Sequence, residues 1–159
     1  MSTLPQLIEE DIRQLDEALR ELLARTEATT GLVIDKGGFL IASQGEARQF
    51  DLTSLAALAS GAFMANQTIA SLVHETHFTS VYQQGENFSM LVTAVDAYCL
   101  LVVIFDARVN AGLVKYFAGP AAARVARQML IARARNPACG LDLSELNLAD
   151  TAELFRRKA

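Results

Sequence analysis

The strongest constraint on the fold comes from residues 52–73, which contain no charged side chain. The segment is long enough to cross a bilayer as a helix, which takes about 20 apolar residues. Polar side chains spread along it argue against a membrane span, because each would need a partner in hydrocarbon. They are Thr53, Ser54, Ser60, Asn66, Gln67, Thr68 and Ser71. We therefore expect a helix that is covered by protein.

The helical periodicity of this segment predicts two faces with different surroundings. One apolar stripe recurs at steps of three and four and is expected to pack on the protein's own core; it comprises Leu55, Leu58, Ala62, Ala65, Ile69 and Leu72. A second face carries small, adaptable or uncharged side chains: Thr53, Ala57, Gly61, Met64, Thr68 and Ser71. An ordinary solvent face would carry Lys and Glu. Either the helix is fully buried in a monomer, or another molecule covers this second face.

Composition limits the class of protein. A chain of 159 residues suits one domain with a sizeable core. A net charge of −4 and the absence of Trp argue against a nucleic-acid-binding surface. Cys99 and Cys139 form neither a zinc nor a disulfide pattern, so reduced thiols are expected. The N-terminal residues lack the pattern of a secretory signal, and we expect a cytoplasmic protein.

The remaining segments predict alternating helices and strands. Helices are expected at 5–28, at 52–73 after a capping Asp51, and at 110–134; strands are expected at 31–35, 39–43, 78–84, 88–95 and 98–105. Lys36-Gly37-Gly38 should join the first two strands as a hairpin, since glycine supplies the positive φ of tight turns. Gly119-Pro120 should kink or split the last helix.

Two of these strands differ in pattern. The segment 98–105 is continuously apolar and should lie in the middle of the sheet with both faces covered. The segment 78–84 mixes polar and apolar side chains, as an edge strand does, and an open edge invites pairing with another chain.

A second region begins after the last helix. We divide the chain into a domain of residues 1–135 and a linker with an acidic tail at 136–159. Asp150 and Glu153 could cap one short helix that presents Leu154 and Phe155. Such a tail either docks into a groove or remains without a partner.

No motif predicts catalysis. His74-Glu75-Thr76-His77 has the wrong spacing for an HExxH zinc site, and Lys36-Gly37-Gly38 joins two strands, unlike a phosphate-binding loop. Arg48 lies in a polar loop, where an arginine is either solvated or, in a regulator of a nucleotide-hydrolysing protein, an arginine finger. We expect no catalytic residue, no metal and no cofactor.

The order of elements resembles that of the roadblock/dynein-light-chain superfamily, and within it the bacterial MglB proteins, which regulate the small Ras-like GTPase MglA. The resemblance depends on LVIDKGGFLIAS at 32–43, DLTSLAALASG at 51–61, LVVIFD at 101–106, GLVK at 112–115 and NLADTAELF at 147–155. These motifs are structural, so they identify the fold more directly than the activity.

The resemblance implies an α+β fold: a three-layer, profilin-like α/β/α domain in which a five-stranded antiparallel sheet has the middle helix on one face and the terminal helices on the other. It also implies a homodimer formed by the third strand and the middle helix. Candidate dimer contacts are Phe63, Gln67, Ala70, His74, Phe78, Ser80 and Tyr82. Candidate GTPase contacts are Thr53, Ala57, Ser60, Gly61, Met64 and Thr68, with Leu154 and Phe155 as contacts from the tail.

By this resemblance the protein is a non-enzymatic GTPase-activating regulator in bacterial polarity or motility control. It would hold the GTPase switch regions and add no catalytic residue. Two departures bear on this function: Met64 and Thr68 stand where related proteins tend to have Ala or Gly, and Gly119-Pro120 interrupts a helix that is usually continuous. The alternatives are a roadblock scaffold subunit without activating ability, and a ligand-sensing domain with a polar internal pocket.

Overall fold

The computed structural model describes residues 4–46 and 48–135. Within them the elements are α1 (Glu9–Thr26), β1 (Thr30–Asp35), β2 (Leu40–Gly45), α2 (Leu52–Leu72), β3 (Ser80–Gln83), β4 (Phe88–Ala94), β5 (Cys99–Asp106) and α3 (Ala111–Arg135). The predicted order of helices and strands is confirmed. The predicted tail at 136–159 lies outside the described residues.

All strand pairs are antiparallel, and the sheet order is β2-β1-β5-β4-β3. β5 lies in the centre and is buried from Cys99 to Phe105, as its continuous apolar sequence predicted. β3 is an edge strand, also as predicted. Its polar composition fits that place because only one of its sides pairs with another strand.

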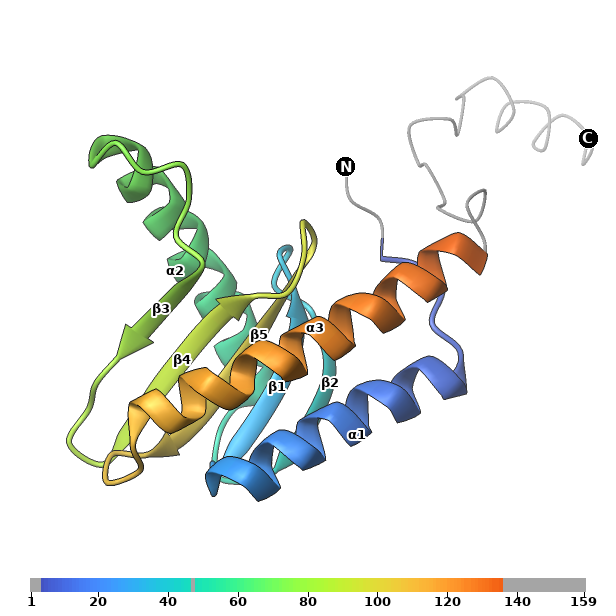
Figure 1. Ribbon diagram of the computed structural model, residues 1–159, viewed down its shortest axis with the longest axis horizontal. Helices are drawn as coiled ribbons and strands as arrows, with labels where there is room; N and C mark the ends of the chain where they lie inside the picture. Colours follow the sequence, from blue (N-terminus) through green and yellow to red (C-terminus); the bar gives the residue numbers. More distant parts are fainter. Residues whose placement is uncertain (1–3, 47, 136–159) are drawn as a thin grey trace, which may run out of the picture.

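The helices cover the two faces of the sheet as the resemblance implied (Figure 1). α1 and α3 pack on one face, where Leu19, Phe105 and Met129 belong to the larger apolar core. α2 packs on the other face, over a smaller core that includes Leu32, Phe63 and Val102. The architecture is therefore the expected three-layer roadblock fold.

α1 begins later than its sequence suggested. Pro5 precedes the helix, which starts at Glu9 because the Asp11 carboxylate accepts a hydrogen bond of 2.9 Å from the backbone N–H of Ile8. This side chain satisfies one of the amide donors that a helix start leaves open.

α3 is continuous through Gly119 and Pro120, so of the two predicted outcomes, a kink or a split, the split is wrong. Pro120 removes one backbone donor, which leaves the carbonyl of Tyr116 without its intrahelical partner. Tyr116 and Pro120 are both exposed, so water can satisfy that carbonyl.

The predicted core stripe of α2 is also wrong. Its members Leu58 and Leu72 are 72% and 75% exposed, and Ile69 is exposed as well. The buried side chains are Ala56, Ala59, Ser60, Phe63 and Ala70, so the face on the sheet is rotated by one residue, or about 100°. Small residues at this contact let α2 lie close to the hairpin, with Phe63 as the one large side chain beneath it.

α2 is long and apolar enough to cross a membrane by length and composition alone, with a mean hydropathy of 1.2. In the fold its first half lies over the sheet, and its C-terminal half projects beyond the strands (Figure 1). The exposure of Ile69 and Leu72 follows from this projection.

Candidate protein interface

The start of α2 is fixed by three polar contacts. The Asp51 carboxylate accepts hydrogen bonds from the backbone N–H and the hydroxyl of Ser54, at 3.1 and 2.6 Å. These hydrogen bonds lower the pKa of Asp51 below its usual value, and the bond from the Ser54 hydroxyl has the larger effect. The Ser60 hydroxyl donates a 2.6 Å hydrogen bond to the carbonyl of Lys36 in the hairpin turn.

The hairpin turn lies directly against the helix. Gly38 has a φ of 92°, and a Cβ at this position would lie 3.0 Å from Cα of Ala57. Only glycine combines this backbone conformation with such a close approach. The LVIDKGGFLIAS motif therefore sets where α2 lies on the sheet.

The side of α2 that faces away from the sheet carries most of the predicted GTPase contacts. Thr53, Ala57, Gly61, Met64 and Thr68 are all exposed. A Cβ at Gly61 would have nothing within 4 Å, so this position is open to an approaching chain. Ser60 differs, because it is 4% exposed and its hydroxyl is bound within the protomer.

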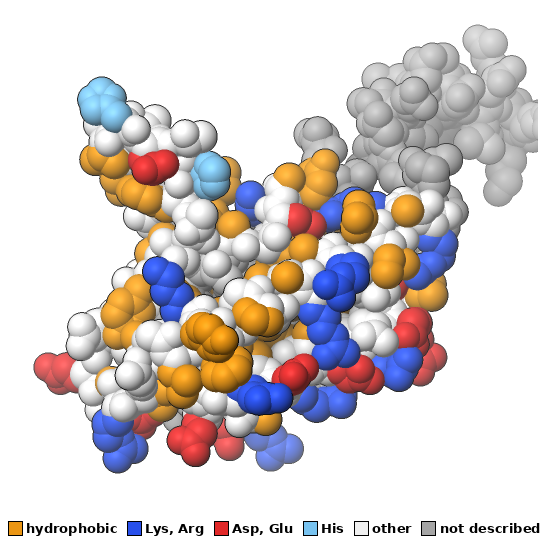
Figure 2. All heavy atoms as spheres, in the orientation of Figure 1, with side chains coloured by type: hydrophobic (Ala, Val, Ile, Leu, Met, Phe, Trp, Pro, Cys, Tyr) orange, Lys and Arg blue, Asp and Glu red, His pale blue; other side chains and the backbone are white. Residues whose placement is uncertain are grey.

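The projecting end of α2 is apolar at the surface. Met64, Ile69, Leu72 and Val73 are exposed there, and Figure 2 shows hydrophobic side chains along this part of the molecule. Between Leu52 and Leu72 no charged side chain interrupts this surface. Apolar patches of this kind mark sites where another protein binds.

Gln67 ties the projecting end of α2 to the segment that leads into β3. Its side-chain amide donates to the carbonyl of Phe78 at 2.9 Å and accepts from the N–H of Phe78 at 3.1 Å. Gln67 was a candidate dimer contact, and the structure gives it this role within the chain. It fixes β3 relative to α2, so that the two form one continuous surface.

The other candidate dimer contacts divide into two groups. Phe63 and Ala70 are 2% and 0% exposed, so in the single chain their side chains offer no surface to a partner. His74 and Tyr82 are exposed, while Phe78 and Ser80 are half-buried. The outer edge of β3 has no strand partner among residues 4–46 and 48–135.

A groove of about 600 Å³ lies between α2 and the β3–β4 side of the sheet. Leu55 and Leu58 form one wall, and Phe88, Met90 and Ile104 lie at its base. It exists because α2 lies mainly against β1 and β2 and approaches the β3–β4 side of the sheet less closely. Sequence reasoning did not find this groove, since its walls are far apart in the chain and no motif connects them.

Phe50 and Phe88 shape one end of the groove. Their rings meet edge to face, with centroids 5.4 Å apart. Neither residue was predicted at the site. An aromatic residue in the loop just before Asp51 was the only available signal in the sequence.

The described residues offer no catalytic constellation. They contain no cluster of three or more His, Cys, Asp or Glu side chains that could hold a metal ion. Burial raises the pKa of the Cys99 thiol to about 11, which keeps it protonated and unreactive. Arg48 is exposed at the surface, and Leu154 and Phe155 lie outside the described residues.

Comparisons with known proteins agree with this architecture. A family model described as the Roadblock/LC7 domain matches residues 14–105. A solved structure described as MglB with tetrameric arrangement is similar at 30% identity and a TM-score of 0.78, covering 83% of this chain and 99% of that one. Among the curated proteins no match is found.

Two further solved structures come from named organisms. The gliding protein MglB from Thermus thermophilus is 29% identical with a TM-score of 0.76, covering 82% of this chain and 99% of that one. Myxococcus xanthus MglB is 30% identical with a TM-score of 0.74, covering 80% of this chain and 96% of that one.

Proposed function

The chain belongs to the Roadblock/LC7 family, and from this premise we propose that it is a homodimeric, non-enzymatic regulator of a small Ras-like GTPase of the MglA type. The dimer binds the GTPase across its α2 helices and stimulates GTP hydrolysis. We place this activity in the cytoplasm, in the control of polarity or motility.

One observation carries the proposal: the side of α2 away from the sheet is exposed, uncharged and open at Gly61. A face that stayed in water would be expected to carry charged side chains, as the outer sides of α1 and α3 do. The absence of charge favours an interface in which polar groups would be costly to dehydrate.

The same surface suits a symmetric dimer. The open edge of β3 and the projecting end of α2 lie side by side, joined by Gln67. In a twofold arrangement each element would meet its own copy. Pairing of the β3 edges would join two sheets into one, and the apolar ends of α2 would be covered together.

The mechanism requires no catalytic group from this chain. A dimer that binds the hydrolysis-competent conformation of the GTPase more tightly than the others raises the population of that conformation. A preference of about 1.4 kcal/mol changes the conformational equilibrium tenfold. The GTPase would then supply its own arginine and glutamine to the nucleotide.

The test is phosphate release from the MglA-like GTPase of the same organism, preloaded with GTP, with and without this protein. We expect acceleration by the unmodified chain and none by Gly61→Arg. Because a Cβ at Gly61 meets no neighbour, the variant should fold normally. Ala123→Arg, at an exposed alanine on α3, is the matched control and should activate fully.

The outcomes separate the proposal from the scaffold alternative. Binding without acceleration would favour a scaffold subunit. Neither binding nor acceleration would refute the GTPase partnership, and equal effects of Gly61→Arg and Ala123→Arg would move the docking site away from α2.

A further inference from the structure

A second groove lies on the opposite side of the molecule, between α1 and α3. It measures about 360 Å³ and is lined by Ala18, Glu21, Leu22, Arg25, Tyr116, Phe117, Pro120, Ala121 and Arg124. It is open because small residues, Ala18 and Ala121, line it where larger side chains would close the gap between the helices. A space of this size accommodates one or two apolar side chains.

Exposed apolar side chains continue the groove along α3. Tyr116 is 72% exposed, and Leu113 and Ile131 are also exposed. Hydrophobic side chains gather over the first half of α3, with Lys and Arg side chains beside them (Figure 2). This surface lies away from α2 and is not used by the proposed GTPase interface.

All charged side chains of α3 have the same sign, whereas the α1 wall of the groove carries Glu21. α3 carries Lys115, Arg124, Arg127, Arg133 and Arg135 and no Asp or Glu. Arg124 is paired with Glu17 at 2.9 Å, and Arg133 and Arg135 are paired as well. Lys115 and Arg127 have no carboxylate within 4.0 Å in the part of the chain that the structure describes.

The segment 141–155 has the complementary composition. It contains Asp142, Glu145, Asp150 and Glu153 and no Lys or Arg, and Arg156, Arg157 and Lys158 follow it. The large apolar side chains of the segment are leucines and Phe155. Acidic and apolar residues on one segment match basic and apolar residues on one helix, which favours association and sets its orientation.

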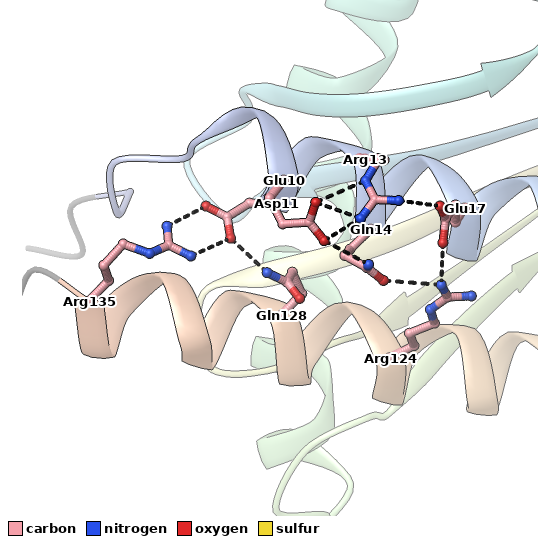
Figure 3. A network of polar contacts seen from close by, with 8 residues as sticks. All are labelled: Glu10, Asp11, Arg13, Gln14, Glu17, Arg124, Gln128 and Arg135. Atoms are coloured by element: carbon pink, nitrogen blue, oxygen red, sulfur yellow. Dashed lines mark hydrogen bonds and ion pairs between the residues drawn. The ribbon is translucent and has the colours of Figure 1, made fainter.

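The last described residue, Arg135, is held against the start of α1. The Asp11 carboxylate accepts two hydrogen bonds from the Arg135 guanidinium, at 2.8 and 3.0 Å, and one from Gln128 at 2.7 Å (Figure 3). From Arg135 back to Pro120 is about 22 Å along a helix at 1.5 Å per residue. The residues 136–149 can span up to about 45 Å when extended, so the chain reaches the groove.

We propose that the acidic segment 141–155 of this chain docks on its own domain, with Leu154 and Phe155 in the α1–α3 groove and its carboxylates beside Arg127, which follows Tyr116 and Pro120 along the rim of the groove. An intramolecular partner is present at a high effective concentration, so a modest contact suffices. Docking withholds Leu154 and Phe155 from any other protein, including a GTPase. The proposal does not depend on the GTPase, because the groove lies across the sheet from α2.

Paramagnetic relaxation in the full chain tests this. A nitroxide is placed at Ala152→Cys in a Cys139→Ser background; Cys99 is buried with a raised thiol pKa and should remain unlabelled. We expect loss of the amide signals of Ala18, Arg25 and Ala121, and no loss at Gly61 on α2.

Two variants locate the contact. Tyr116→Asp should restore the lost signals, since it places a negative charge where the acidic segment docks. Phe39→Asp, at a similarly exposed aromatic residue of the hairpin, is the matched control and should leave the pattern unchanged. Both side chains lie mostly in water, so neither change should unfold the domain.

A mixed sample distinguishes the source of the segment. Chains that carry the spin label at natural isotope abundance are mixed with isotope-enriched chains that lack the spin label. If signals are lost when one chain carries both the spin label and the isotopes, but not in the mixed sample, the segment docks in cis. Signal loss in the mixed sample would overturn the proposal, because a second copy would then supply the tail. No signal loss at the groove, or loss at α2 instead, would also overturn the proposal.

Discussion

α2 and α3 lie on opposite faces of one sheet and differ most in charge. α2 has no charged residue between Leu52 and Leu72, whereas α3 carries five cations and no carboxylate. α3 is tied to α1 by ion pairs and hydrogen bonds across the helix pair (Figure 3). α2 is held by small residues, Phe63 and a few hydrogen bonds, and its far half projects from the sheet (Figure 1).

This contrast indicates what each helix is suited for. Polar contacts at several points fix α3 within the domain, and its outer side carries cations beside exposed apolar side chains. α2 has neither ionic contacts nor a charged outer side, so its remaining surface is suited to another protein chain.

The attachment of α2 should depend on Phe63. Phe63→Ala removes the one large side chain of the helix that is fully buried in the smaller core, and we expect a loss of about 3 to 5 kcal/mol in the free energy of unfolding. Urea denaturation measures this change. Leu58→Ala, at a position 72% exposed, should cost far less. Similar losses for both variants would mean that α2 packs in a different rotation.

The attachment of α3 should depend on Asp11 and on pH. The Arg135 guanidinium, helped by the N–H of Ile8 and by Gln128, holds the pKa of Asp11 well below its usual range. The carboxylate therefore stabilises the fold above the pKa of the unfolded chain, about 3.9, and this stabilisation is lost as the pH falls through the folded-state pKa. Asp11→Asn should cost about 2 kcal/mol at neutral pH.

Unfolding experiments at several pH values check the direction of this pH dependence. The difference in free energy of unfolding between the unmodified protein and Asp11→Asn should narrow as the solution is made more acidic. Arg135 is about one-third exposed and can be hydrated in the variant. The stability lost in Asp11→Asn should therefore be smaller than the loss on breaking a fully buried ion pair. A gap that is constant with pH would show that the charge of Asp11 contributes nothing.

The projecting end of α2 should determine the oligomeric state. Leu72→Asp places a charge on the proposed dimer surface, and we expect the dimer dissociation constant to rise at least about tenfold, equivalent to 1.4 kcal/mol. Leu130→Asp on α3 is the matched control, because its side chain is similarly exposed. Sedimentation velocity across a concentration series compares them. Dissociation by Leu130→Asp alone would place the dimer surface on α3.

Much of the fold could be predicted from local patterns. The glycine turn defines the first hairpin, Asp51 marks the start of α2, and the continuous apolar run of β5 places it in the middle of the sheet. In α1 most acidic residues lie on the solvent side and Leu15 and Leu19 lie in the core, although Asp11 is buried as well.

The rotation of α2 could not be predicted in the same way. With no charge to mark the solvent side, the stripe through Leu58 and Leu72 and the stripe through Phe63 and Ala70 were both plausible core faces. Long-range contacts decided between them, above all the approach of Gly38 to Ala57. The groove beside Phe88 was missed for the same reason, since its walls meet only in the folded chain.

The smallest expected difference between the two helices concerns the effect on stability of replacing one glycine in each by alanine. Gly61 in α2 and Gly119 in α3 both leave open space where a Cβ would lie. Gly61→Ala should raise the free energy of unfolding by about 0.5 to 1 kcal/mol, because alanine loses less backbone freedom in a helix. Gly119→Ala should raise the free energy of unfolding by less, since a Cβ on the residue before Pro120 clashes with the proline ring in the helical conformation.

Protein concentration sharpens this last comparison. If a second chain approaches α2 closely at Gly61, the added methyl group weakens that contact, and the gain from Gly61→Ala should shrink as dimer forms. The small effect of Gly119→Ala should not change with concentration, because α3 lies on the other face of the sheet. Urea denaturation of both variants at dilute and concentrated protein measures this. A gain at Gly61 that is independent of concentration would argue that the dimer leaves this part of α2 in water.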